Sequence, residues 1–208
     1  MKILLFIIIL LPTSLSANEV DWVEIKNAFS DYVNEPNDIS ANKAIKSLPE
    51  VYTQLKSKES LSASEYIYNY NQFGMLERQV ISSHQPSVRL AFRLRSFADG
   101  GFSEDISILL GQLIRINPTL FLSELVIAKP KVKSYGNFLN EGEIFVDRFT
   151  AQCHELALRR EALKTVTNPN LQEAKNEFIL IVTEALSASP CKQYNNALNR
   201  DRASRAAP

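Results

Sequence analysis

Apolar residues recur at spacings of three and four along most of this chain, segment after segment. Such a period places one apolar stripe on each helix, whereas the strict alternation of a half-buried strand is almost absent. Glycine, which often punctuates chains of short strands, occurs only 6 times in the 208 residues. The sequence therefore predicts an all-α fold.

Capping residues and prolines set the expected helix boundaries. We expect a capping box of Ser62 and Glu65 to start a long third helix, and Ser103 to cap a later one. Pro118 and Pro169 each follow an asparagine and stand where a first helical residue is favoured. The apolar stripes then predict helices over residues 20–34, 38–48, 62–84, 87–98, 103–116, 118–126, 147–166 and 170–187.

Two blocks of similar length, residues 87–126 and 149–186, are each expected to pair amphipathic helices around a tight turn. Their length of about 40 residues is that of a HEAT-like helical pair. The blocks do not align position by position, so an irregular helical bundle and a short array of antiparallel helical hairpins both fit. The expected parts are an N-terminal lobe (18–129), a loop connector (130–146), a C-terminal hairpin (147–191) and a disordered tail (192–208).

The first 17 residues have the composition of a secretory signal peptide. Lys2 supplies the positive charge, residues 3–11 are all apolar, and Pro12 and several small residues follow. We expect cleavage after Ala17, with Ser16 as the alternative, to give an exported soluble protein. The apolar stretch is too short to span a bilayer. The chain has no Asn-x-Ser/Thr glycosylation acceptor, which favours the bacterial periplasm over the extracellular space.

Charge and cysteine content narrow the expected partners and compartment. Loss of Lys2 with the signal peptide leaves 22 basic against 23 acidic residues, so no global charge attracts nucleic acid or an anionic membrane. An even pair of cysteines in an oxidising compartment most simply forms one disulfide, here between Cys153 and Cys191. Free thiols or a redox pair are the alternatives, although redox pairs usually lie close together as Cys-x-x-Cys.

Motifs that carry catalysis or bind metals and cofactors do not occur. The two histidines, His84 and His154, lack metal-ligand spacing, and there is no Gly-x-Ser-x-Gly or glycine-rich phosphate loop. We therefore expect no catalytic residue, metal site or cofactor, and favour a protein without enzymatic activity. A glycan-cleaving enzyme would instead need carboxylates in a cleft, and the available acids are Glu104, Asp105, Glu124, Glu141, Glu143 and Asp147.

A few residues are candidates for binding. Arg95 projects from the apolar arc of its helix, so it either pairs with a neighbouring helix or contacts an anionic ligand. Arg160 interrupts its own stripe in the same way. Tyr66 and Tyr70 belong to an aromatic stripe that fits core packing or the rim of a cleft. Ile108 and Leu180 each lie among polar residues and would mark a partner surface if they lie close together.

These features favour an exported, non-enzymatic protein-binding module with an unidentified protein partner. A periplasmic immunity or inhibitor protein fits the size and the export signal. The alternatives are a carboxylate-dependent enzyme acting on cell-wall glycans, and a helical protein that binds a small ligand between its helices.

Overall fold

The computed structural model describes residues 20–49, 57–95, 100–128, 149–188 and 191–192. The described residues form helices and their connections, which confirms the all-α prediction. The expected signal peptide, the connector and residues 193–208 of the expected tail lie outside the described residues. The helices are α1 (Trp22–Asn34), α2 (Asp38–Ser47), α3 (Lys58–Ile67), α4 (Tyr70–Ile81), α5 (Gln85–Arg95), α6 (Gly100–Ile116), α7 (Pro118–Ala128), α9 (Phe149–Lys164) and α10 (Gln172–Ser187).

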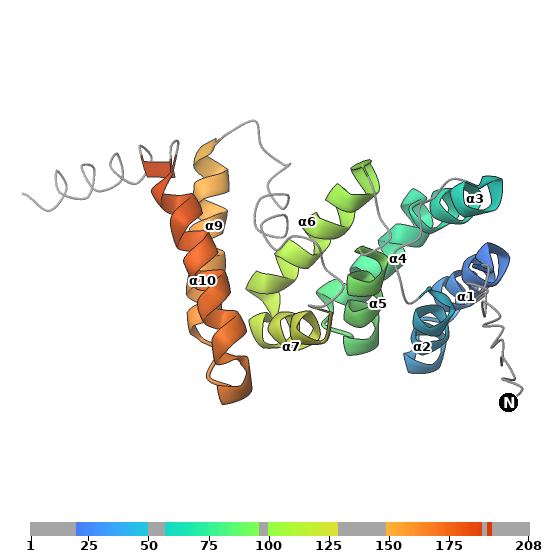
Figure 1. Ribbon diagram of the computed structural model, residues 1–208, viewed down its shortest axis with the longest axis horizontal. Coiled ribbons are helices and arrows are strands. Elements are labelled where there is room, and N and C mark those ends of the chain that lie inside the picture. The colour runs from blue at the N-terminus through green and yellow to red at the C-terminus, as the bar shows by residue number, and fades with distance from the viewer. Residues whose placement is uncertain (1–19, 50–56, 96–99, 129–148, 189–190, 193–208) are drawn as a thin grey trace, which may run out of the picture.

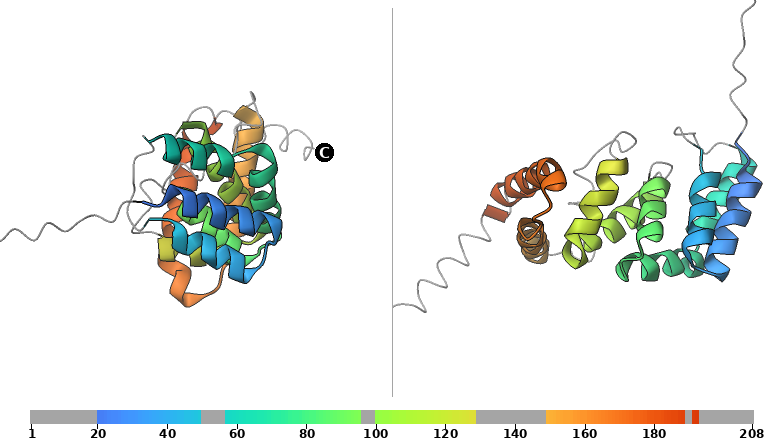
Figure 2. Two further views of the ribbon diagram at one scale, coloured as in Figure 1. Left: turned by 90° about the vertical axis from the view of Figure 1, so that its right-hand side faces the viewer. Right: turned by 90° about the horizontal axis from the view of Figure 1, so that it is seen from below.

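The helices follow one another along an elongated array, from α1 and α2 at one end to α9 and α10 at the other (Figure 1). α1 packs on α2 and α3, and α2 also contacts α5. In the middle, α5 contacts α4, α6 and α7. The antiparallel hairpin of α9 and α10 closes the array against α6 and α7, and Figure 2 shows the pairs in succession.

One hydrophobic core runs through the whole array. It extends from Ile25 and Phe29 in α1 to Leu186 in α10 and Cys191, all of which are buried. Three phenylalanine rings join the middle of the array to its end. The ring centroids of Phe92 and Phe121 are 5.6 Å apart, and those of Phe121 and Phe178 are 5.4 Å apart. Because burial of large apolar side chains is the main stabilising contribution, the helices of the array are expected to fold together.

Three boundary predictions are wrong. The expected helix over 62–84 is two helices, because the chain breaks after Ile67 and α4 begins at Tyr70. Ser57, not Ser62, caps α3 by accepting a hydrogen bond from the backbone of Ser60 at 3.0 Å. Ser103 lies inside α6, which already begins at Gly100. Elsewhere the predicted helices agree with the structure to within a few residues, apart from residues outside the described ranges.

The pair Cys153 and Cys191 lies at disulfide distance, with the two Cα atoms 5.4 Å apart. Both cysteines are buried. The bond joins α9 to the short segment that follows α10, as the sequence predicted. It thereby fixes the end of the described chain against the last hairpin.

Candidate functional site

A groove of about 840 Å³ opens between α4 and α6. It exists because the chain turns at Tyr68 and Asn69 instead of continuing as one helix. Tyr68 ends α3, and the side chain of Asn69 caps α4 by accepting a hydrogen bond from the backbone of Asn71 at 3.2 Å. The change of direction places Tyr68 and Tyr70 among the residues that line the groove, together with residues of α6.

Aromatic rings form one wall of this groove. The ring of Tyr68 stacks on Phe102 with centroids 4.3 Å apart, and it lies 5.9 Å from Phe73. Its hydroxyl also donates a long hydrogen bond of 3.5 Å to the carbonyl of Leu94. These contacts hold Tyr68 in place, so this part of the wall is preorganised. Tyr70, by contrast, is 90% exposed at the edge of the groove.

Carboxylates enter the groove from both helices. Glu77 of α4 is half-buried, whereas Asp105 of α6 is exposed and directly follows Glu104, after the first turn of the helix. Partial burial raises the pKa of Asp105, and the neighbouring charge of Glu104 raises it further. Within the described part of the chain, no lysine or arginine forms an ion pair with these three acids. The groove therefore holds negative charge that the described residues do not neutralise.

Arg78 is the basic residue among those that line the groove. It is exposed, and its Nε donates a hydrogen bond of 3.2 Å to the carbonyl of Gly74 on its own helix. An exposed guanidinium is well solvated, so its influence on the groove is screened. Gly74 itself faces open space, since a Cβ added there would meet no atom within 4 Å.

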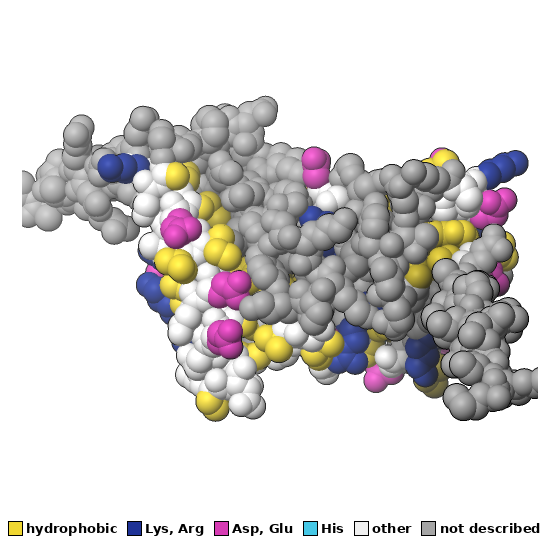
Figure 3. Space-filling model, viewed as in Figure 1, with side chains coloured by type: hydrophobic (Ala, Val, Ile, Leu, Met, Phe, Trp, Pro, Cys, Tyr) yellow, Lys and Arg dark blue, Asp and Glu magenta, His cyan; other side chains and the backbone are white. Residues whose placement is uncertain are grey.

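The candidate binding residues fall into different places. Tyr70 and Ile108 line the same groove, although they come from helices that are predicted separately. Tyr66 is half-buried and lies outside it, where the ammonium of Lys26 sits 5.3 Å from its ring centroid. Leu180 is 58% exposed on α10 and is not among the residues that line the groove. Figure 3 shows acidic side chains spaced along α10 with apolar side chains between them.

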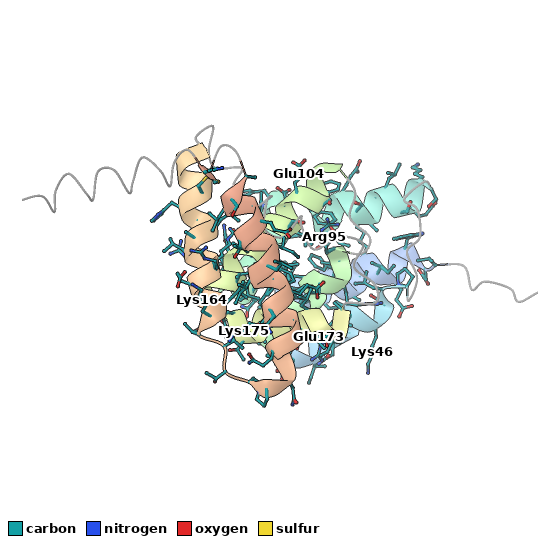
Figure 4. The ribbon with its side chains drawn as sticks, turned by 60° about the vertical axis from the view of Figure 1, so that its left-hand side comes forward. Lys46, Arg95, Glu104, Lys164, Glu173 and Lys175 are labelled. Carbon is teal, nitrogen blue, oxygen red and sulfur yellow. A yellow bond between two sulfur atoms is a disulfide. The ribbon has the colours of Figure 1, made fainter. Side chains whose placement is uncertain are left out.

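Arg95 connects two helices. Its Nε donates a hydrogen bond of 2.7 Å to the buried hydroxyl of Ser107, so it ties the end of α5 to α6 near Glu104 (Figure 4). Of the two expectations for Arg95, this contact supports pairing with a neighbouring helix. On α9, the side chain of Arg160 remains 30% exposed, whereas that of Arg159 is fully buried. The arginine that lies within the apolar side of α9 is therefore Arg159.

Glu124, considered above as a catalytic acid, is held in a structural ion pair. Its side chain is fully buried, and both of its oxygens accept hydrogen bonds of 2.8 Å from Arg89. The side chain of Gln85 donates a further one at 2.7 Å. This network joins α5 to α7, and the same pairing with Glu124 raises the pKa of Arg89. Glu124 cannot reach a substrate from this position.

A chain of hydrogen bonds containing aspartate, histidine and serine links α1, α2 and α5. Asp38 Oδ1 lies 2.9 Å from His84 Nε2, and His84 Nδ1 lies 2.7 Å from the hydroxyl oxygen of Ser87. The hydroxyl of Tyr32 donates to the same oxygen at 2.8 Å. In a hydrolase the aspartate is buried and the serine reaches the substrate. Here Ser87 is fully buried and Asp38 is exposed, so these hydrogen bonds hold the helices together and do not prepare Ser87 for nucleophilic attack.

Sequence reasoning missed both networks and the groove itself. Asp38 and His84 are 46 residues apart, and Arg89 and Glu124 are 35 apart. No local spacing connects such residues. A signal for the groove was present in the Asn69 cap, because asparagine at that place favours a new helix start.

Comparison with protein-family models, curated proteins and solved structures finds no match to this chain. Within the described ranges, no helix is both long enough and apolar enough to cross a membrane. The same ranges contain no group of three or more histidine, cysteine or carboxylate side chains placed to hold a metal ion.

Proposed function

We propose that this chain is an exported, non-enzymatic protein that binds a segment of a partner protein in the groove between α4 and α6. The groove itself carries the proposal. It has a fixed aromatic ring at Tyr68, apolar lining residues that include Ile108 and Leu109, and charged residues from both helices. Clefts with this mixture of apolar surface and a few polar groups are typical binding sites.

The exposed ring of Tyr70 favours a protein over a small molecule. It is 90% exposed at the edge of the groove, and a small ligand held inside would leave most of it in water. Tyrosine is enriched among the residues that dominate protein interfaces. Elongated helical arrays also present long surfaces suited to a partner chain. A partner that enters the groove and extends past its edge would cover Tyr70.

Export belongs to the same proposal, with the bacterial periplasm as the compartment. The signal-peptide composition of residues 1–17 supports it, and the cysteine pair at disulfide distance is compatible with it. A periplasmic immunity or inhibitor protein is one kind of binding protein that fits.

The test is affinity capture of the mature protein from its own periplasmic or secreted fraction. A phenylalanine in place of Gly74 would project a ring into the groove and obstruct it, because the space beside that residue is open. Gly74→Ala is the matched control, since it changes the same position without filling the groove. We expect one stoichiometric partner with the unmodified protein and with Gly74→Ala, and its loss with Gly74→Phe. Capture of the same proteins by all three would contradict the proposed site.

A second function, cleavage of cell-wall glycans, is favoured by one observation. Asp105 lines a groove with aromatic residues, and its pKa is shifted upward by partial burial, which is the direction that a general acid requires. Incubation with purified peptidoglycan and analysis of the released fragments tests this function. Release that disappears in Asp105→Asn and persists in Asp31→Asn, an exposed acid of α1, would establish it.

A further inference from the structure

We infer that the occupant of the groove between α4 and α6 is an extended peptide segment in which lysine or arginine side chains stand beside apolar ones. The inference rests on the proposed function and names the chemistry of its partner. Three properties of the groove support it: acids without a cationic partner, an aspartate whose charged form is disfavoured, and aromatic rings next to both.

The first property is the charge of the groove. Glu77 and Asp105 come from α4 and α6, and Glu104 adds a third negative charge beside Asp105. None of the three is paired with a cation of the described residues. Glu77 is half-buried, Glu104 and Asp105 are exposed, and Glu77 and Asp105 line the groove. A peptide cation placed between them would complete the ion pairs that the fold leaves open.

The second property is the environment of Asp105. Its pKa is raised first by burial and second by Glu104, so its charged form is less stable than that of an ordinary aspartate. A bound cation would reverse both effects, because it replaces lost solvation and offsets the like charge. The charged form of Asp105 is thus more stable with a cationic occupant than in the empty groove.

The third property is the aromatic and apolar surface next to these acids. The Tyr68 ring is fixed by its stacking on Phe102, and Tyr70 is free at the edge. Aromatic faces attract ammonium and guanidinium groups, and they also pack against the methylene stems of lysine and arginine. Phe73 and Ile108 supply apolar contacts for neighbouring side chains of the peptide. A purely charged ligand would leave this surface uncovered.

Arg78 is the residue that argues most directly against a cationic occupant. It lines the groove with a positive charge, but it is exposed and already donates one of its hydrogen bonds to Gly74. Two acids, Glu77 and Asp105, line the groove against this one arginine, and screening by water reduces its repulsion of a peptide cation. The balance of charge therefore still favours a basic segment.

The experiment measures fluorescence anisotropy of three labelled nonapeptides with the full mature chain. The first peptide is Gly-Ser-Leu-Lys-Leu-Lys-Leu-Ser-Gly, and the others carry glutamine or glutamate in place of both lysines. We expect the lysine peptide to bind at least about 10-fold more tightly than the glutamate peptide, with the difference shrinking at high salt. Asp105→Asn and Glu77→Gln should each weaken the binding of the lysine peptide by about 3- to 10-fold. The control Glu173→Gln, on α10 and far from Glu104 in Figure 4, should change nothing.

The outcomes separate this inference from the proposed function. Equal binding of all three peptides, weakened equally by Gly74→Phe, would overturn the preference for a cation and leave a protein-binding groove. No binding of any peptide at millimolar concentration would overturn the inference, while the capture experiment still tests the proposed function independently. Binding of soluble peptidoglycan fragments alone would overturn it in favour of the glycan function. A peptide of residues 193–208, which carry three arginines, serves as a competitor of the lysine peptide. If it displaces the lysine peptide, the occupant is a segment of this same chain, and the assignment to a separate partner is overturned.

Discussion

The hydroxyl group of Tyr32 is buried in the core and donates a hydrogen bond of 2.8 Å to Ser87. Burial raises the pKa of Tyr32 to about 12, above its ordinary value of 10.0, and the bond to Ser87 offsets this only in part. The folded protein therefore keeps the phenol proton at a pH where the unfolded chain has lost it. The stability that depends on this proton is complete below pH 10 and falls as the pH rises toward 12, by up to about 1.4 kcal/mol per unit.

Replacing Tyr32 with phenylalanine tests this pH dependence. At pH 7 the variant should be less stable by about 1 kcal/mol, because Ser87 loses a buried hydrogen bond. Above pH 10 this deficit should shrink, because the variant has no phenol to ionise. Urea unfolding at pH 7, 9, 10 and 11 measures both effects. Tyr70→Phe, at an exposed position, should follow the unmodified protein throughout, and a constant deficit in Tyr32→Phe would contradict the argument.

The ion pair of Arg89 and Glu124 predicts an asymmetric pair of mutational effects. Arg89→Met leaves a fully buried carboxylate with only Gln85 as partner, which should destabilise the protein by about 3 kcal/mol. Adding Glu124→Leu removes the unpaired charge, so the double variant should recover at least half of that loss. Urea unfolding measures the difference, with the exposed Arg78→Met as control. A single variant as stable as this control would show that the pair does not hold α5 to α7.

The left-handed residue Ser83 ends α4. Its φ is 63°, its backbone N–H donates to the carbonyl of Val80, and that of His84 donates to the carbonyl of Gln79. This is the Schellman pattern of hydrogen bonds, in which glycine is favoured at the left-handed position. Ser83→Gly should therefore stabilise the protein by up to about 1 kcal/mol, measured by thermal unfolding. Ser82→Gly, where φ is −73°, should give no gain, and equal effects at both positions would contradict the prediction.

Helix content and most helix boundaries could be predicted because apolar spacing and prolines are local signals. The break between α3 and α4 was missed, because its one local signal is the Asn69 cap, no glycine or proline marks it, and the apolar stripe continues on both sides. Packing decided it: Tyr68 stacks on Phe102 of a helix that lies some 34 residues further along the chain. The groove depends on that break, so the sequence named Tyr70 and Ile108 without placing them together.

Contacts between residues far apart in the sequence also decide the roles of the acids and of Arg95. Sequence reasoning grouped Glu124 with Asp105, but one is fixed in an ion pair and the other borders a groove. Their spacing along the chain gives no sign of this difference, because it depends on Arg89 reaching from another helix. Arg95 was expected to need a partner, and its bond to Ser107 supplies one. Local pattern thus identified Arg95 as a residue that needs a partner but did not do so for Glu124, and tertiary structure chose the partners of both.

The last hairpin is joined to the array both by its core and by the cysteine pair. Phe178 and Val182 of α10 are fully buried, and α9 packs on α6 and α7. The bond between Cys153 and Cys191 closes a loop of 38 residues, which the chain-entropy model equates with about 4 kcal/mol. The apolar contacts persist without it. Reduction should therefore lower the Tm, by roughly 10 °C, and leave the chain folded at 25 °C.

Circular dichroism melts with and without a reductant test this, and a Cys153→Ser, Cys191→Ser double variant should melt at the same lower Tm in both. Thiol titration of protein isolated from its native compartment should find no free cysteine, because a pair at this distance oxidises in the oxidising compartment proposed above. Two free thiols there would contradict the disulfide, and with it one support for export. Unfolding at 25 °C on reduction would instead show that the covalent bond, rather than the core shared with α6 and α7, holds the hairpin in the array.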